Sequence, residues 1–412
     1  MHILALIIFL ATYAGIALGG IPGLALDRTG IAVLGAIAFV ATGIVSTGDA
    51  VSAIDFPTIL LLYSLMVLSS QFRLGGFYTW AALRITRLMD RPQRFLLAMM
   101  LVSALLSAVL ANDIVCLAFT PVLAVSLLRA GINPVPFLIG LAVASNIGSA
   151  ATIIGNPQNM LIGQVGQLDF GRFFLWCAPP SLISLAAGYL IIVALYRRQF
   201  VQPTPPLPDM HEQWPAFDRH QSSKGILATM VLIVLFFTGI PREISAIAIA
   251  GLLLCSRKMQ TRSLLGLVDW HLITLFCALF IVIKGVETTQ LSVRIINALE
   301  TNRIDLQHPL MLTLLATLLS NLVSNVPATM LLTKFLDPSH SLPWYILALA
   351  STYAGNLITI GSIANLITFE QAKEYGITVS FREHARAGIP VTAVSLLIAL
   401  SWIAAAEHIL RP

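Results

Sequence analysis

Four short polar segments interrupt an otherwise apolar chain, and their residues are of the types that bind small solutes inside membranes. Two lie at the centres of long apolar regions: Ala111-Asn112-Asp113 and Ser324-Asn325-Val326-Pro327. The other two, 145–159 and 351–365, are rich in Gly, Asn, Ser and Thr and follow apolar stretches. Carbonyl, amide and hydroxyl oxygens suit a small cation, whereas the N-termini of broken helices suit an anion or a polar neutral solute.

We therefore expect these segments to form one site for a solute or an ion. The candidate residues are Asn112, Asp113, Ser145, Asn146, Thr152, Gly155, Asn156, Asn159, Ser324, Asn325, Thr329, Thr359, Gly361, Ser362 and Asn365. For any one segment the alternative is a Gly or Pro kink whose polar side chains only join helices together. Four segments, paired by an internal repeat, favour the binding site.

Asp113 is the only carboxylate deep within either interrupted region. An acid inside a membrane is costly and usually functional, so Asp113 is the candidate for proton coupling. It is also placed to cap the helix that follows it, and the two roles are compatible.

Other polar residues give simpler interpretations. Lys284 and Glu287 are three residues apart and should form a local ion pair at the outer interface. His271 should lie unliganded at the inner interface. No Cys or His cluster suggests a metal, so we expect no metal, no catalytic residues and no cofactor. The expected coupling ion is H+, with Na+ as the alternative.

The elements that position these residues must be membrane-spanning helices. The 412 residues are 57% hydrophobic and 10% charged, with a mean hydropathy of +0.87, whereas a soluble domain is about 25% charged. This excludes a soluble enzyme and a disordered protein. The net charge is only +5, and the basic residues are scattered along the chain, which excludes a nucleic-acid binder. The fold class is therefore an all-α polytopic membrane protein.

Ten segments approach the length of about 20 apolar residues that a crossing helix needs. They are residues 2–20, 28–46, 57–73, 134–152, 173–197, 225–240, 243–257, 270–288, 343–360 and 387–406. The halves of the interrupted regions 95–129 and 308–336 have only about 15 residues each, which predicts re-entrant hairpins. Residues 77–94 predict an amphipathic helix on the inner membrane surface.

An internal repeat relates the two halves of the chain. Asp55-Phe56 corresponds to Asp269-Trp270, 214 residues later, and the segment ending at Asn112 corresponds to the one ending at Asn325. Gly155-Asn156-Pro157-Gln158-Asn159 corresponds to Gly361-Ser362-Ile363-Ala364-Asn365, 206 residues later. The odd number of spans in each half makes the repeats inverted, as in many secondary transporters, so the polar segments should meet near the midplane.

The expected organisation follows from this repeat. It comprises an N-terminal repeat over 1–198 (five spans, hairpin 95–129, broken helix 134–163), a Pro-rich linker over 199–223 and a C-terminal repeat over 224–412 (five spans, hairpin 308–336, broken helix 343–370). Most Lys and Arg residues fall on one side if both termini are outside, in the periplasm, and the linker is cytoplasmic.

Three motifs resemble those of the ion transporter superfamily, in the branch of arsenite permeases and related bacterial inner-membrane permeases. They are Leu110-Ala111-Asn112-Asp113 with Thr120-Pro121, Ser324-Asn325-Val326-Pro327-Ala328-Thr329, and Ile154-Gly155-Asn156-Pro157-Gln158-Asn159. The resemblance implies a homodimer with a fixed scaffold domain and a transport domain that moves as an elevator. Sodium/dicarboxylate symporters of the superfamily carry Ser-Asn-Thr at both tips, and this chain does not, which favours proton coupling.

The sequence thus predicts a secondary active transporter for proton-coupled efflux of arsenite or antimonite across the inner membrane. Arsenite is a neutral trihydroxide at neutral pH, so it suits a site of Asn, Ser and Thr without Lys or Arg. The alternatives are a proton- or sodium-coupled carrier of small carboxylates or inorganic oxyanions, and a sodium/proton antiporter. The expected partners are the solute, membrane lipid, a second copy of the chain and, for an arsenite pump, an ATPase subunit.

Overall fold

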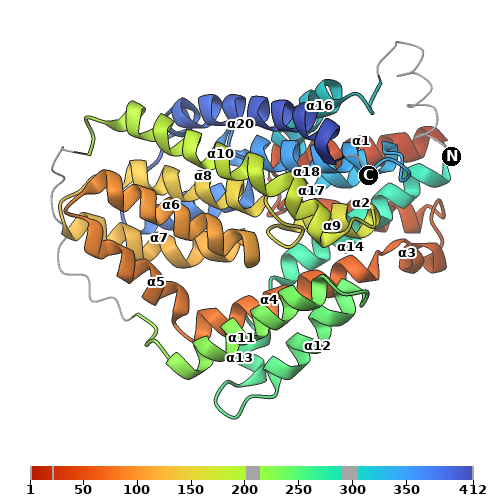
Figure 1. Ribbon diagram of the computed structural model, residues 1–412. Helices are drawn as coiled ribbons and strands as arrows, with labels where there is room; N and C mark the ends of the chain where they lie inside the picture. Colours follow the sequence, from red (N-terminus) through yellow and green to blue (C-terminus); the bar gives the residue numbers. More distant parts are fainter. Residues whose placement is uncertain (1, 21–22, 201–213, 290–304, 411–412) are drawn as a thin grey trace.

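The computed structural model describes residues 2–20, 23–200, 214–289 and 305–410, and helices are the regular elements of these ranges. Figure 1 shows them as a bundle with both ends of the chain at the same end of the molecule. The helices of the first half are α1 (His2–Leu18), α2 (Arg28–Ala41), α3 (Thr47–Ala53), α4 (Phe56–Leu74), α5 (Phe77–Ile85), α6 (Pro92–Val109), α7 (Asn112–Arg129), α8 (Val135–Ser149), α9 (Pro157–Val165) and α10 (Phe170–Tyr196).

The second half resembles the first in the order of its described helices, but α17 is much shorter than its counterpart α7. Its members are α11 (Arg219–Phe236), α12 (Arg242–Leu254), α13 (Thr261–Leu265), α14 (Trp270–Thr288), α16 (Pro309–Val323), α17 (Asn325–Leu332), α18 (Leu342–Ala354), α19 (Ile363–Glu374) and α20 (Phe381–Leu410). Short 3-10 turns follow α5 (Thr86–Leu88), follow α17 (Thr333–Phe335) and precede α19 (Thr359–Gly361).

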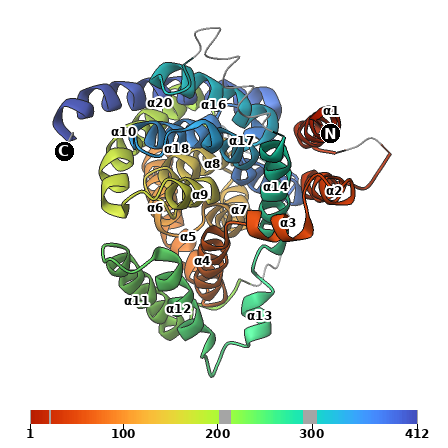
Figure 2. The ribbon, with the colours of Figure 1, turned by 90° about the vertical axis from the view of Figure 1, so that its right-hand side faces the viewer.

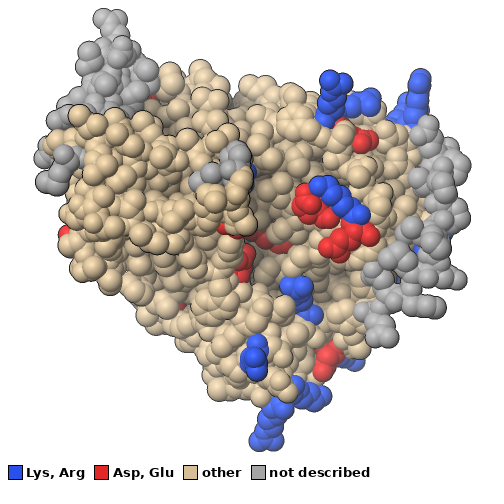
Figure 3. Space-filling view, turned by 180° about the vertical axis from the view of Figure 1, so that it is seen from behind, with Lys and Arg blue, Asp and Glu red and all other residues tan. Residues whose placement is uncertain are grey.

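The chain is an all-helical membrane protein with several apolar spans. In the described ranges six helices are long and apolar enough to cross a bilayer, namely α4, α6, α7, α10, α14 and α20. The helices α1, α2, α8 and α16 are apolar but shorter. Figure 3 shows a broad surface almost free of charged side chains, as contact with lipid requires, and charged side chains around a hollow.

The two helices of the first interrupted region are longer than the arms of about 15 residues that the sequence predicts. Helices α6 and α7 have 18 residues each and are long enough to cross by length and composition. The interruption is confined to Leu110 and Ala111, because Asn112 already belongs to α7. In the second region α16 has 15 residues, as predicted, and α17 has only 8, so this arm is shorter than predicted.

The predicted amphipathic helix over 77–94 ends early, at Ile85. The chain continues as the 3-10 turn Thr86–Leu88, and Pro92, which begins α6, disfavours a helical conformation at Arg91. Tyr78 and Ala82 form the buried face of α5, whereas Trp80 and Leu83 are exposed. A short helix, α3, also follows the second apolar segment, and Ser46 caps it.

The helices of the two halves pack against each other reciprocally. Helix α2 packs on α14 of the second half, and its counterpart α12 packs on α4 of the first. Likewise α7 packs on α19, and α17 packs on α9. Figures 1 and 2 show α11–α13 together at one edge, away from α1 and α20.

Both long polar segments break a helix at a capping residue. Helix α8 ends at Ser149, and α9 begins after Asn156, whose side chain accepts a hydrogen bond from the N–H of Asn159. Helix α18 ends at Ala354, and the Ser362 side chain caps α19 by accepting from the Ala364 N–H. Asn and Ser are favoured at this position because their oxygens satisfy the free N–H groups of the first turn.

Close packing of α8 on α6 depends on Gly148. A Cβ atom there would lie 2.3 Å from the carbonyl oxygen of Ala104, which belongs to the backbone and cannot turn aside. Gly251 in α12 has no heavy atom within 4 Å of the same position. These two glycines are a matched pair, since each lies within a helix.

We predict that Gly148→Ala lowers the thermal midpoint of the detergent-purified protein by several degrees, since overpacking costs about 1–3 kcal/mol. Gly251→Ala should leave the midpoint unchanged or raise it, because Ala is the better helix former. Fluorescence-monitored thermal unfolding measures both. Equal midpoints for the two variants would contradict the packing described here.

Candidate functional site

Two asparagine amides hold the ends of the broken helices. Each amide nitrogen donates to two backbone carbonyls, one directly at the end of the preceding helix and one three residues further along. The end of a helix leaves carbonyls without a partner inside the helix. The distances are Asn159 Nδ2 to Ser149 O, 3.3 Å, and to Thr152 O, 3.0 Å; and Asn365 Nδ2 to Gly355 O, 2.7 Å, and to Ile358 O, 3.3 Å. All three pairs of equivalent residues are 206 positions apart. The two halves therefore build the same local structure.

The broken helices are also joined to each other across the halves. The Asn156 amide donates to Thr352 Oγ1 at 3.3 Å, and Ser362 Oγ donates to Asn146 Oδ1 at 2.9 Å. Asn146 Nδ2 donates in turn to Asn365 Oδ1 at 3.0 Å. Asn146 and Thr352 are again 206 residues apart. In each half, the residue that caps the helix after the break thus bonds a polar side chain in the helix before the break of the other half.

The tips of the two interrupted regions bond to the broken segment of their own half. The N–H of Asn112 donates to Gly155 O at 3.3 Å. The Asn325 amide is oriented so that its nitrogen donates to Gly361 O at 2.8 Å and to Ser351 O at 3.2 Å. Among the described residues no hydrogen bond joins the two tips directly. The glycines Gly155 and Gly361, equivalent in the repeat, instead connect them to the centre.

The remaining predicted residues have varied surroundings. Ser145 Oγ donates to Asn112 O at 3.1 Å, and the Thr152 hydroxyl donates to Ala108 O. Thr329 is buried. Thr359 lies outside the central network, 3.3 Å from Nδ1 of His384.

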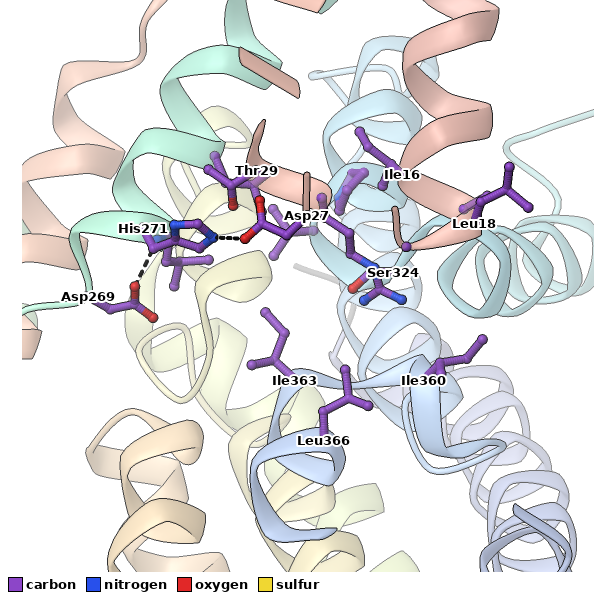
Figure 4. A pocket seen from close by; sticks show the side chains of 17 residues that line it. Ile16, Leu18, Asp27, Thr29, Asp269, His271, Ser324, Ile360, Ile363 and Leu366 are labelled. Atoms are coloured by element: carbon purple, nitrogen blue, oxygen red, sulfur yellow. Dashed lines mark hydrogen bonds and ion pairs between the residues drawn. The ribbon is translucent and has the colours of Figure 1, made fainter. Parts of the chain in front are cut away.

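A cavity of about 440 Å³ lies beside this network, between the facing ends of α1 and α2, the start of α14, and α19. Figure 4 shows Ser324 of the second tip and Ile363 and Leu366 of α19 among its lining residues. Ser324 has a backbone φ of 77°, which residues other than glycine rarely adopt. Residues with such backbone angles are found most often at functional sites. By contrast, Asn159 and Asn365 are fully buried and are absent from the cavity wall.

The charged residues of the cavity wall are nearly balanced. They are Asp27, Arg28, Asp269 and His271. His271 has a partner, since its Nε2 lies 2.5 Å from Oδ2 of Asp27 (Figure 4). The hydrogen bond from the Gly30 N–H, with a further contribution from His271, lowers the pKa of Asp27. Asp27 is therefore ionised at neutral pH.

Asp113 is half-buried in the first turn of α7. Helix α7 has no side-chain cap, so the capping alternative for Asp113 is wrong. Asp269 of the second half caps α14 and lines the cavity.

Sequence reasoning missed two members of the network, Thr352 and Asn356. Asn356 Oδ1 accepts a hydrogen bond from Asn146 Nδ2 at 2.9 Å. The repeat offset carried a signal for Thr352, because it is the residue equivalent to Asn146. It also missed His384, which is buried and T-stacked on Phe369, and for which the sequence offered no signal.

Two simpler predictions can be compared with the structure. Lys284 and Glu287 form the predicted ion pair, with Nζ and Oε2 3.8 Å apart, and Lys334 approaches the same carboxylate at 2.8 Å. In the described part of the chain, no three His, Cys, Asp or Glu residues are grouped so as to hold a metal.

Apolar spans that break at a buried polar centre beside a cavity define a membrane transporter. A family model described as a citrate transporter matches residues 4–354, and the chain belongs to this family, CitMHS, of secondary transporters. It is not an enzyme. The description of the family names citrate, whereas the motifs resemble those of arsenite permeases.

Similar proteins cover nearly the whole chain. A 46 kDa membrane protein of Mycobacterium leprae is 30% identical over 97% of both chains. A putative transporter arsB of Dictyostelium discoideum is 23% identical, covering 95% of this chain and 89% of that protein, and a silicon efflux transporter of Oryza sativa is 26% identical over 93% of both. The solved YdaH transporter of Alcanivorax borkumensis, which has an unusual topology, shares the fold, with a TM-score of 0.61, 13% identity, and coverage of 99% of this chain and 98% of that one.

We predict that Asn365→Asp lowers the thermal midpoint although it keeps the side-chain shape. The carboxylate cannot donate to the buried carbonyl of Gly355, and an unpaired buried group costs about 1–3 kcal/mol. Asn159→Asp should have a similar effect, because the two amides are equivalent. Gln260→Glu, the same chemical change at an exposed position, is the control. Thermal unfolding in detergent measures all three, and an unchanged midpoint for both Asn variants would contradict this role.

Proposed function

We propose that the protein is a proton-coupled exporter of small neutral hydroxylated solutes, with arsenite and antimonite as its substrates. The observation that carries this proposal is the balance of charge on the cavity wall. Two carboxylates, Asp27 and Asp269, stand against one guanidinium, Arg28, and His271 is hydrogen-bonded to Asp27. A polyanion would find no excess of positive charge there, whereas a neutral solute needs none.

The polar network supports the same substrate class. Its side chains are amides and hydroxyls, which both donate and accept hydrogen bonds, as a trihydroxide does. The names of two relatives, a putative arsB transporter and a silicon efflux transporter, agree with export of small hydroxylated solutes.

A carrier of small carboxylates is the second candidate. Two observations favour it: the description of the family model as a citrate transporter, and the presence of Arg28 on the cavity wall. A guanidinium pairs well with a carboxylate, so a solute with a single carboxylate fits better than citrate.

Transport requires the cavity to open to each side in turn, and we assign this movement to two inverted repeats over 1–198 and 224–412. The reciprocal packing of α2 on α14 and of α12 on α4 supports the repeat. So do the equivalent hydrogen bonds of Asn159 and Asn365.

In this proposal the interrupted regions and broken helices move as an elevator against a scaffold within a homodimer of the inner membrane. With both termini in the periplasm, the described cavity faces the cytoplasm.

Transport assays with the purified protein in proteoliposomes test the substrate directly. We expect a pH gradient to drive accumulation of arsenite, and excess citrate to leave that accumulation unchanged. Accumulation of citrate without arsenite would replace the first candidate by the second. Transport that follows a sodium gradient at constant pH would overturn proton coupling.

Asp113 is the proposed proton carrier, and Asp113→Asn tests it. The variant keeps the shape of the side chain but cannot bind and release a proton, so pH-driven transport should be lost while solute exchange without a gradient persists. Glu374→Gln, at an exposed position, should transport normally. Full proton-driven transport by Asp113→Asn would show that another group carries the proton.

A further inference from the structure

One contact joins the start of α12, in the second half, to the end of α9, in the first half. Arg242, the first residue of α12, donates from Nη2 to Gly163 O at 2.6 Å and to Gln164 Oε1 at 3.0 Å, and its Nη1 donates to Leu168 O. Gln164 Nε2 also donates to Glu243 Oε2 at 3.0 Å. Gly163 O also accepts from the Leu168 N–H at 3.0 Å, so Arg242 adds to the bonds at the end of α9, where a cation is favoured. The start of α12 is thereby fastened to the end of α9.

The repeat gives each member of this contact a counterpart. Arg28 begins α2 as Arg242 begins α12, and the two are 214 residues apart, the same offset as between Asp55 and Asp269. The offset of 206 that relates Asn159 to Asn365 relates Gln164 to Glu370. The counterpart of an arginine–amide contact is therefore an arginine–carboxylate pair.

In this structure the counterpart contact is open. Arg28 lies on the cavity wall, and no hydrogen bond or ion pair of its side chain is seen within the described ranges. Across the cavity, Ile363 and Leu366 line the wall from α19. Glu370 lies seven residues after Ile363 and four after Leu366, so it is on the same face of α19, about one turn beyond Leu366. Glu370 is exposed and pairs only locally, with Lys373 Nζ at 2.6 Å.

We infer that the cavity closes when Arg28 binds Glu370, and that this ion pair forms as Arg242 releases the end of α9. The inference rests on the inverted repeats of the proposed function but not on the identity of the solute. It assigns Arg28 and Glu370 as positioning residues of the closed cavity. The Glu370–Lys373 pair must open or be shared, which a solvent-exposed pair does at little cost.

Paired cysteines test this exchange of contacts. The background is the full chain with Cys255→Ser and Cys277→Ser, since Cys116 and Cys177 are buried. We expect Arg242→Cys with Gln164→Cys to cross-link without a gradient. Arg28→Cys with Glu370→Cys should cross-link only when a pH gradient and solute drive transport. Arg28/Glu370 cross-linking that is independent of turnover, or absent during it, would overturn the inference.

Charge reversal gives a second test in the chain without added cysteines. Arg28→Glu should slow transport by about tenfold or more, because two carboxylates then face each other in the closing cavity. Adding Glu370→Arg should restore the rate, and Lys373→Gln alone should leave it unchanged. Normal arsenite transport by Arg28→Glu would refute the Arg28–Glu370 ion pair and leave the proposed substrate standing. If the chain instead transports another solute, and the double variant restores transport of that solute, the proposed substrate is refuted and the ion pair stands.

Discussion

A helix that ends inside a membrane leaves backbone groups that lipid cannot satisfy, and this constraint governs the structure. The carbonyls of Ser149 and Gly355, at the ends of α8 and α18, accept from the amides of Asn159 and Asn365. Asn146 donates to Asn365 and Asn156 donates to Thr352, so the two broken helices are joined across the halves. The centre of the molecule is therefore a shared polar network, and the cavity lies beside it.

Much of this arrangement could be predicted from the sequence. Hydropathy located the apolar helices, and the positions of Asn159 and Asn365 indicated equivalent breaks. The length of α6 and α7 could not be predicted, since the interruption proved to be only two residues, and Asn112 begins a helix instead of ending one. Partners distant in sequence, such as His271 with Asp27, depend on how the halves pack, and local patterns do not encode that packing.

The two halves share a backbone plan but differ in side chains where function requires a difference. Ser324 at the second tip has a positive φ, whereas its counterpart Ala111 has a φ of −55°. The first tip alone carries an acid, Asp113. The halves differ likewise at their scaffold contacts, where Arg242 is bound to α9 and Arg28 faces the cavity. Such differences between equivalent positions are expected if one side of a carrier is closed while the other is open.

The central claim is that one cavity opens to the two sides of the membrane in turn. A single Ile363→Cys on the cavity wall, in a chain with Cys255→Ser and Cys277→Ser, tests it through labelling by a membrane-impermeant maleimide. In oriented vesicles during transport, we predict labelling from either side, and a change in the ratio of the two labelling rates when the gradient is reversed. Labelling from one side only, under both gradients, would contradict alternating access.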